Sequence, residues 1–150
     1  MATPVTPRVT AYLCCKEAAH ALAFYTQAFG ATEVMCLREP GTGKIGHAEI
    51  TIGETLIMLA DEFPDFGAVS PKTLGGSPVK LHLHVGDCDA VVKQAVARGA
   101  KVIRPVEDQF YGERSGTIED PFGHQWMVST TKENVSPAEM QKRYDALMKK

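Results

Sequence analysis

The segments Ala28-Phe29-Gly30-Ala31 and Ala97-Arg98-Gly99-Ala100 lie 69 positions apart and nearly repeat each other. Each segment ends a helical pattern of apolar residues, follows a short apolar strand and leads into a β-rich stretch. A single βαβββ unit cannot bury its own sheet face, so two such units are expected to pack together. The repeat therefore predicts an α+β fold of two tandem βαβββ modules, which form an open, mixed-sheet, barrel-like cleft. Any function is expected in that cleft.

The repeat also sets the expected domain organisation. We expect a single domain over residues 1–150, with module one at about 8–60 and module two at about 79–130. Residues 61–78 contain prolines and glycines and few periodic apolar positions, which is typical of an inter-module loop. A C-terminal helix is expected over about 136–149.

Local signals mark the ends of several elements. Residues 9–13 are expected to form the first strand, and Gly30 is expected to end the first helix. Asp87 or Asp89 can cap the helix of module two. Ser136-Pro137-Ala138-Glu139 is a capping box with proline at the first helical position. The tail helix that follows carries one apolar stripe, which suits docking on the domain or on a second subunit: Met140, Tyr144, Leu147 and Met148.

Composition excludes several classes of function. A net charge of −2 and a pI near 6.2 do not favour binding to nucleic acid or to an anionic membrane. The first residues have no charged and apolar signal pattern, and no apolar run is long enough to span a bilayer. The four cysteines match neither a zinc pattern nor a disulfide framework. A cytoplasmic protein with free thiols is the resulting expectation.

Strand alternation predicts which side chains line the cleft. The apolar face of each strand should pack on a helix, so the opposite face is free to line a cavity. On the strands of module one, this places Tyr12, His47 and Glu49 on the open side. The open positions of module two are Lys80, His82, His84, Gln125, Met127 and Ser129. The segment His82-Leu83-His84 is expected to face His47-Ala48-Glu49. This group of ionisable side chains favours a functional site over an ordinary solvated sheet face.

The doubled module, Phe24-Tyr25 near the end of the first helix, and the turn Glu119-Asp120-Pro121-Phe122-Gly123-His124 carry a family resemblance. Over residues 8–130 the chain resembles the vicinal oxygen chelate (VOC) superfamily. This superfamily includes glyoxalase I, extradiol dioxygenases, and fosfomycin- and bleomycin-resistance proteins. Within it, the chain is most similar to the PhnB-like group, whose functions are largely unassigned. The resemblance implies a homodimer in which two chains complete each other's clefts.

The resemblance also implies four positions for a metal, which fall at Thr10, Met58, Lys80 and Met127. Two thioethers, an ammonium and a hydroxyl do not suit a divalent metal. We therefore expect neither a cofactor nor glyoxalase I activity. One alternative is a relocated metal site at His47, Glu49 and His82. The other is that these three side chains form a hydrogen-bonded wall.

Three functions follow from these residues. The first is metal-free binding of a small organic molecule, as in bleomycin-resistance proteins. The second is a metal-dependent lyase, isomerase or dioxygenase that uses the relocated site. The third is a metal-independent enzyme with His47 or His82 as general base. In the loop 110–115, Arg114 can bind a carboxylate or phosphate, or can pair with Glu113 or Glu119. The predicted ligand-binding residues are Tyr12, His47, Glu49, Met58, Lys80, His82, Tyr111, Arg114 and Met127.

Overall fold

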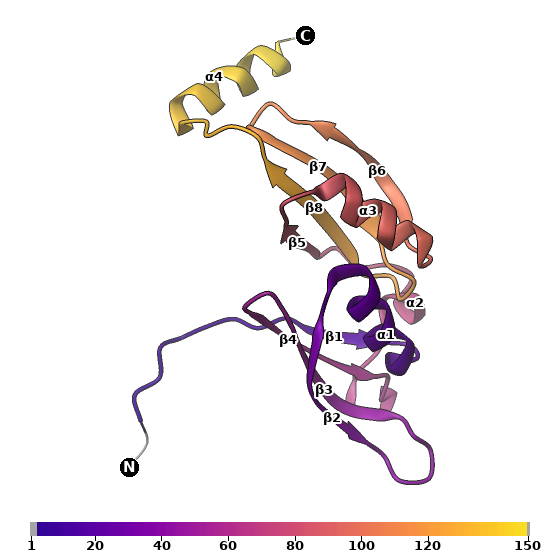
Figure 1. Ribbon diagram of the computed structural model, residues 1–150. Helices are drawn as coiled ribbons and strands as arrows, with labels where there is room; N and C mark the ends of the chain where they lie inside the picture. The colour runs from indigo at the N-terminus through magenta and orange to yellow at the C-terminus, as the bar shows by residue number, and fades with distance from the viewer. Residues whose placement is uncertain (1–2, 150) are drawn as a thin grey trace.

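The computed structural model describes residues 3–149 and contains two four-stranded mixed sheets (Figure 1). The first sheet has the order β1-β4-β3-β2 and the second the order β5-β8-β7-β6. The α+β fold with two βαβββ modules and a C-terminal helix is therefore confirmed, and the sheets do not close into a barrel. The elements are β1 (Tyr12–Cys15), α1 (Ala18–Phe29), β2 (Thr32–Arg38), β3 (Ile45–Ile52), β4 (Thr55–Asp61), η1 (Pro64–Phe66), α2 (Pro71–Leu74), β5 (Lys80–His84), α3 (Cys88–Ala97), β6 (Lys101–Asp108), β7 (Glu113–Glu119), β8 (Gln125–Thr131) and α4 (Pro137–Met148).

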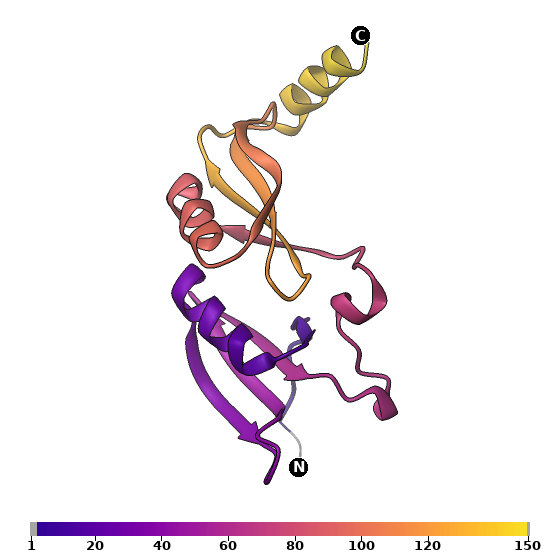
Figure 2. The same ribbon diagram turned by 90° about the vertical axis from the view of Figure 1, so that its right-hand side faces the viewer.

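The two modules repeat the same topology in space. In each one the first strand pairs in parallel with the last strand, and the other pairings are antiparallel. Helices α1 and α3 lie on the same side of the molecule and contact each other (Figure 2). The Gln94 side-chain amide donates to the carbonyl of Gln27 across this contact at 3.2 Å. One face of each sheet is thus covered, and the opposite face carries the polar residues.

The predicted helix ends are confirmed. Gly30 ends α1 with φ +69°, a conformation that glycine adopts without strain. Asp87 caps α3 by accepting from the amide of Ala90 at 3.1 Å. Ser136 accepts from the amide of Glu139 at 3.1 Å at the start of α4.

The last strand of each module also holds the first turn of that module's helix. Asp61, in β4, accepts from the amides of Ala18 at 2.8 Å and Ile45 at 2.7 Å. Thr130, in β8, accepts from the amide of Cys88 at 2.8 Å. Asp61 and Thr130 are 69 positions apart, so the repeat extends from topology to a shared capping contact.

A buried carboxylate joins the modules. Asp120 follows β7, is 2% exposed and accepts four hydrogen bonds. Its donors are the Tyr25 hydroxyl of α1, the Trp126 indole of β8, and the amides of Phe122 and His124. The turn predicted to set the last strand therefore also connects module two to the helix of module one.

Two expectations about local structure are wrong, and the segment between the modules has more regular structure than expected. The first strand begins at Tyr12, where pairing with Met58 starts, and Val9 is fully exposed. The expected inter-module loop contains η1 and α2; Ser70 caps α2 at the amide of Thr73, with Pro71 at the first helical position. Val79 is exposed, and Leu81, Leu83 and Val85 are only half-buried, because α3 packs on β6, β7 and β8 rather than on β5.

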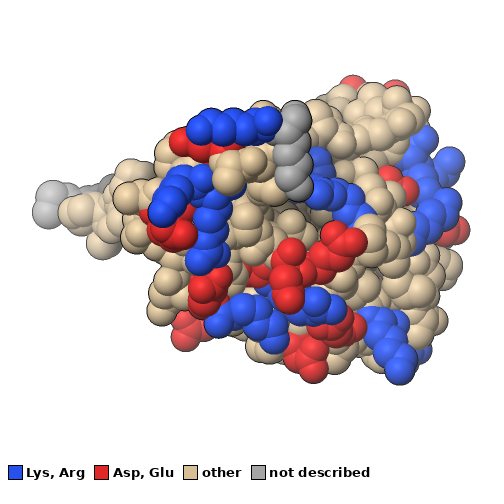
Figure 3. All heavy atoms as spheres, turned by 90° about the horizontal axis from the view of Figure 1, so that it is seen from above, with Lys and Arg blue, Asp and Glu red and all other residues tan. Residues whose placement is uncertain are grey.

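The C-terminal helix projects from module two (Figure 1). It buries none of its residues: Tyr144 packs beside Phe110, and Leu147 and Met148 stay exposed. Whether a second copy of the chain covers this stripe stays a prediction. The face drawn in Figure 3 mixes acidic and basic side chains, with no large area of one sign. No helix within residues 3–149 has the length and apolar character needed to cross a membrane.

Glu17, between β1 and α1, provides a first prediction. It has φ +68°, the left-handed region in which a side chain is strained, and its side chain makes no cap hydrogen bond. Glu17→Gly is expected to be more stable than Glu17→Ala by about 1 kcal/mol, because only alanine keeps the strained Cβ. Urea unfolding of the two variants measures the difference. Equal stability would mean that the Glu17 backbone is not strained.

Candidate functional site

A chain of hydrogen bonds lies on the open face of module one. The Tyr12 hydroxyl of β1 lies 2.9 Å from Nδ1 of His47, and Nε2 of His47 lies 2.8 Å from Oε2 of Glu49. His47 and Glu49 are two residues apart on β3, so both point to the same side of the sheet. Met58 of β4 is in register with both Tyr12 and Glu49 and lies between them. The structure therefore brings four of the predicted site residues together.

The distances in this chain fit a proton path from Tyr12 through His47 to Glu49. Burial raises the pKa of the Tyr12 hydroxyl, and the nearby Cys14 and Glu49 raise it further, so this hydroxyl keeps its proton near neutral pH. In the tautomer that carries its hydrogen on Nε2, the His47 ring accepts at Nδ1 from the Tyr12 hydroxyl. The imidazole hydrogen then lies on Nε2 and is donated to Glu49, which fixes the orientation of the ring.

A cavity of about 620 Å³ opens beside Tyr12. Its walls include Cys14 and Ala60 from the open sheet face, and Phe63 and Phe66 from the segment that follows β4. Phe66 is 87% exposed, an unusual state for a large apolar side chain. The ammonium of Lys44 lies 4.3 Å from the centre of the Phe63 ring and helps to hold that segment against the sheet.

Sequence reasoning missed Phe63 and Phe66. Both lie in the segment interpreted as a loop, where no periodic pattern indicates which way a side chain points. The available signal for a binding surface was the pair of phenylalanines in Phe63-Pro64-Asp65-Phe66, because large apolar residues are uncommon in solvated loops.

The polar side chains of module two pair within their own sheet. His82 lies 2.6 Å from the Ser129 hydroxyl, and His84 lies 2.7 Å from the Thr131 hydroxyl. Lys80 is exposed, and Met127 is in register with His82 on the neighbouring strand. Tyr111 contacts Ser115 through their hydroxyl groups, 3.2 Å apart. These residues share one open face, and their hydrogen bonds stay within module two.

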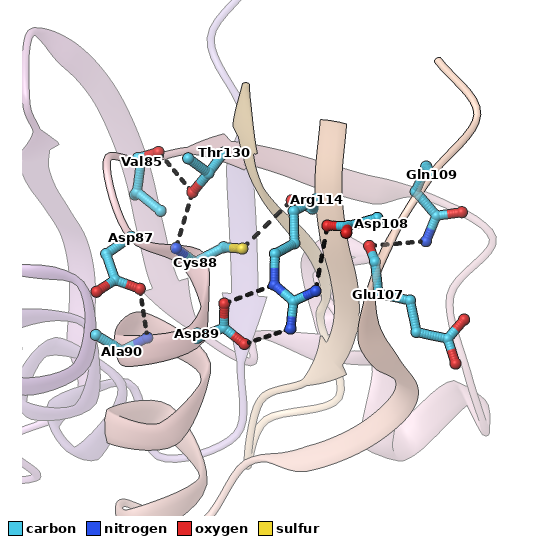
Figure 4. A network of polar contacts seen from close by, with 10 residues as sticks. All are labelled: Val85, Asp87, Cys88, Asp89, Ala90, Glu107, Asp108, Gln109, Arg114 and Thr130. Atoms are coloured by element: carbon cyan, nitrogen blue, oxygen red, sulfur yellow. Dashed lines mark hydrogen bonds and ion pairs between the residues drawn. The ribbon is translucent and has the colours of Figure 1, made fainter. Parts of the chain in front are cut away.

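Arg114 lies on the opposite, helix-covered side of the same sheet (Figure 4). Its guanidinium donates to both oxygens of Asp89 on α3, at 2.7 and 3.1 Å, and to Asp108 on β6 at 3.2 Å. These hydrogen bonds raise the pKa of Arg114 and lower that of the Asp89 carboxyl. The partners are therefore not Glu113 or Glu119, and Arg114 links α3 to the edge strand β6.

The side chains present do not fit the metal that the family resemblance implies. Met58, Lys80 and Met127 supply no carboxylate, imidazole or thiolate. The relocated set is divided, because His47 and Glu49 bond to each other in module one and His82 bonds to Ser129 in module two. Within residues 3–149, no three His, Cys, Asp or Glu side chains lie close enough to hold a metal ion.

Two tandem βαβββ modules, each with one helix-covered and one polar sheet face, define the fold class of this chain. The family model described as the Glyoxalase/Bleomycin resistance protein/Dioxygenase superfamily matches residues 7–128. The chain therefore belongs to this superfamily, also called the VOC superfamily.

The chain is also similar to individual known proteins. The chain is 39% identical over 145 residues to the uncharacterized protein Mb0911c of Mycobacterium bovis, covering 94% of each protein. Its fold is similar to that of protein PA1353 from Pseudomonas aeruginosa, with a TM-score of 0.69, 24% identity, and coverage of 85% of this chain and all of that one. It is also similar to the PhnB protein of Bacillus cereus, with a TM-score of 0.66, 19% identity, and coverage of 83% of this chain and 100% of that one. At these identities the two solved structures show the fold alone.

Proposed function

We propose that this protein binds a small organic molecule in the cavity beside Tyr12. The observation that carries the proposal is an open cavity that combines aromatic walls with an oriented polar group. Phe63 and Phe66 supply apolar contact area, and the hydroxyl of Tyr12 lies at the cavity with its direction set by His47. A volume of about 620 Å³ is in the range of small-molecule sites.

The donor set supports a binding role without a metal. The polar groups of module one already satisfy one another through Tyr12, His47 and Glu49, so they can orient a ligand without a cation. Membership of a superfamily named in part for bleomycin resistance is consistent with binding alone.

The uncharged fluorescent dye Nile red provides a direct test of the cavity. Phe66→Ala is expected to weaken Nile red binding about tenfold, because truncating a large aromatic contact removes at least about 1.4 kcal/mol of binding free energy. Dye fluorescence measured against protein concentration gives the two dissociation constants. Leu74→Ala removes another exposed apolar side chain, from α2, and should leave binding unchanged. An equal effect of both substitutions would place the dye elsewhere and contradict the proposal.

A second candidate function is proton transfer without a metal, with His47 as the general base. The observation that favours it is the Tyr12–His47–Glu49 chain, in which a carboxylate orients an imidazole and the imidazole meets a hydroxyl. In such an arrangement a proton can pass from a bound molecule through Tyr12 to His47, while Glu49 stabilises the imidazolium that forms.

This chain makes a specific prediction for the ring of His47. NMR of the imidazole nitrogens should show the hydrogen on Nε2 at neutral pH, because Nδ1 accepts from Tyr12. Tyr12→Phe removes this donor, and the Nδ1 resonance should move toward that of an imidazole without a hydrogen-bond donor. His124 accepts no hydrogen bond from Tyr12 and is the internal control. A hydrogen on Nδ1 in the unmodified protein would rule out the proposed direction of proton transfer.

A further inference from the structure

A second hollow lies at the junction of the modules, apart from the cavity beside Tyr12. Its volume is about 390 Å³, and its lining shares no residue with that cavity. It is formed by the start of α1, by α2, by the end of α3, and by the turn after β7. The lining residues are Lys16, Glu17, His20, Ala23, Phe24, Gln27, Lys72, Arg98, Pro121 and Phe122.

The charge of this hollow is positive. Lys16, Lys72 and Arg98 reach it from three different parts of the chain, and Glu17 is the single carboxylate in the lining. None of these three cations takes part in the ion pairs found within residues 3–149. Arg114 and Arg143, in contrast, each pair with two carboxylates. Glu17 in the lining and Glu62, whose pKa the nearby Lys16 helps to lower, offset only part of this charge. An anion would further reduce the repulsion among the three cations.

The base of the hollow is apolar. The rings of Phe24 and Phe122 meet edge to face with their centres 6.2 Å apart, and Pro121 lies beside them. The two phenylalanine side chains come from different modules, so the hollow exists only because the modules pack together. A flat apolar group can lie on this base while an attached anion reaches the three cations.

The backbone adds an independent indication. Glu17, the one residue other than glycine with positive φ among residues 3–149, lies in the wall of this hollow. Strained residues are concentrated at ligand sites, where the surrounding structure holds them in place. Glu17 lies between Lys16, which also lines the hollow, and the first turn of α1.

We propose that this hollow is a second binding site, for a small organic molecule with a planar body and a phosphoryl group. Arg98 presents a planar fork that matches two phosphoryl oxygens, and Lys72 and Lys16 add point charges. The planar body rests on Phe24, Pro121 and Phe122. The site lies away from the open sheet faces, so it can be filled together with the cavity beside Tyr12.

Phenylphosphonate, which has a ring and a stable dianionic group, tests this site by titration calorimetry. The unmodified protein is expected to bind it saturably, and more tightly than inorganic phosphate, because only phenylphosphonate contacts the apolar base. The double substitution Arg98→Gln and Lys72→Gln should weaken binding at least about tenfold. Both side chains are exposed, so the variant is expected to fold, which circular dichroism checks.

Arg38→Gln is the matched control, because Arg38 is exposed in β2 and lies outside the hollow. It should bind phenylphosphonate as tightly as the unmodified protein. The proposal is wrong if no saturable binding is seen at about 10 mM ligand, or if Arg38→Gln loses as much affinity as the double variant. Equal affinity for phenylphosphonate and inorganic phosphate would also overturn it. Phe66→Ala should not change phenylphosphonate binding, so this test is independent of the Nile red test.

Discussion

Asp120→Ala is expected to lower the free energy of unfolding by about 3–5 kcal/mol, enough to unfold much of a marginally stable domain. The substitution leaves four donors without an acceptor: the Tyr25 hydroxyl, the Trp126 indole and two backbone amides. These groups are largely shielded from water, and each unpaired buried donor costs about 1–3 kcal/mol. Urea unfolding followed by Trp126 fluorescence measures the loss.

Two further variants separate the contributions to this network. Tyr25→Phe removes one donor and leaves the Asp120 carboxylate with three, so it should lower stability by only about 1–2 kcal/mol. Asp120→Asn keeps one oxygen for the two backbone amides and turns an amide group toward the indole. Its loss of stability should therefore lie between those of Tyr25→Phe and Asp120→Ala. If Asp120→Ala were no more destabilising than Tyr25→Phe, the carboxylate would not be the centre of the network.

The role of Asp120 shows what the sequence could predict about the fold and what it could not. The repeat predicted the topology of both modules because turn glycines and strand alternation are local signals. The acidic turn was recognised as the start of the last strand for the same reason. Its main partner, Tyr25, is 95 positions away, and no local pattern reports a contact of that range.

The candidate site was predictable to a similar degree. Alternation along β3 placed His47 and Glu49 on the open face, where they lie. The hydrogen bond from Tyr12 depends on how β1 and β4 pair, which periodicity does not specify. Arg114 is a residue whose partners the sequence predicted wrongly. Its neighbours in sequence suggested Glu113 or Glu119 as partners, but adjacent strand residues face opposite sides, and its real partners come from α3 and β6.

The two open faces are not equivalent, although the modules repeat. Met58 and Met127 are 69 positions apart and occupy matching places on β4 and β8. Tyr12 and Glu49 flank the first methionine, whereas His82 and Thr117 flank the second. The row of module one can relay a proton between a hydroxyl and a carboxylate. In module two, His82 bonds to Ser129, and His84 meets Thr131 and Glu113 through the same nitrogen, Nε2. Neither imidazole therefore bridges a hydroxyl and a carboxylate, and both proposed functions use module one.

Asp61→Ala is the second substitution with a large expected effect, a loss of about 3 kcal/mol in the free energy of unfolding. Asp61 is 9% exposed and accepts from the amides of Ala18 and Ile45, so it joins the first turn of α1 to the start of β3. Alanine leaves both amides unpaired and also removes a negative charge from the helix N-terminus, where such a charge is stabilising. Urea unfolding measures the loss, and circular dichroism checks that the variant still folds.

The repeat supplies the control for this substitution. Thr130 occupies the matching place in module two, where its hydroxyl accepts from the helix amide of Cys88 and donates to the carbonyl of Val85. Both are neutral hydrogen bonds, so Thr130→Val should lower stability by only about 1–2 kcal/mol. Asp61→Asn keeps one acceptor and places a donor against the other amide, so its loss should lie between those of Thr130→Val and Asp61→Ala. If Asp61→Ala and Thr130→Val were equally destabilising, the negative charge of Asp61 would add nothing to what two neutral hydrogen bonds contribute.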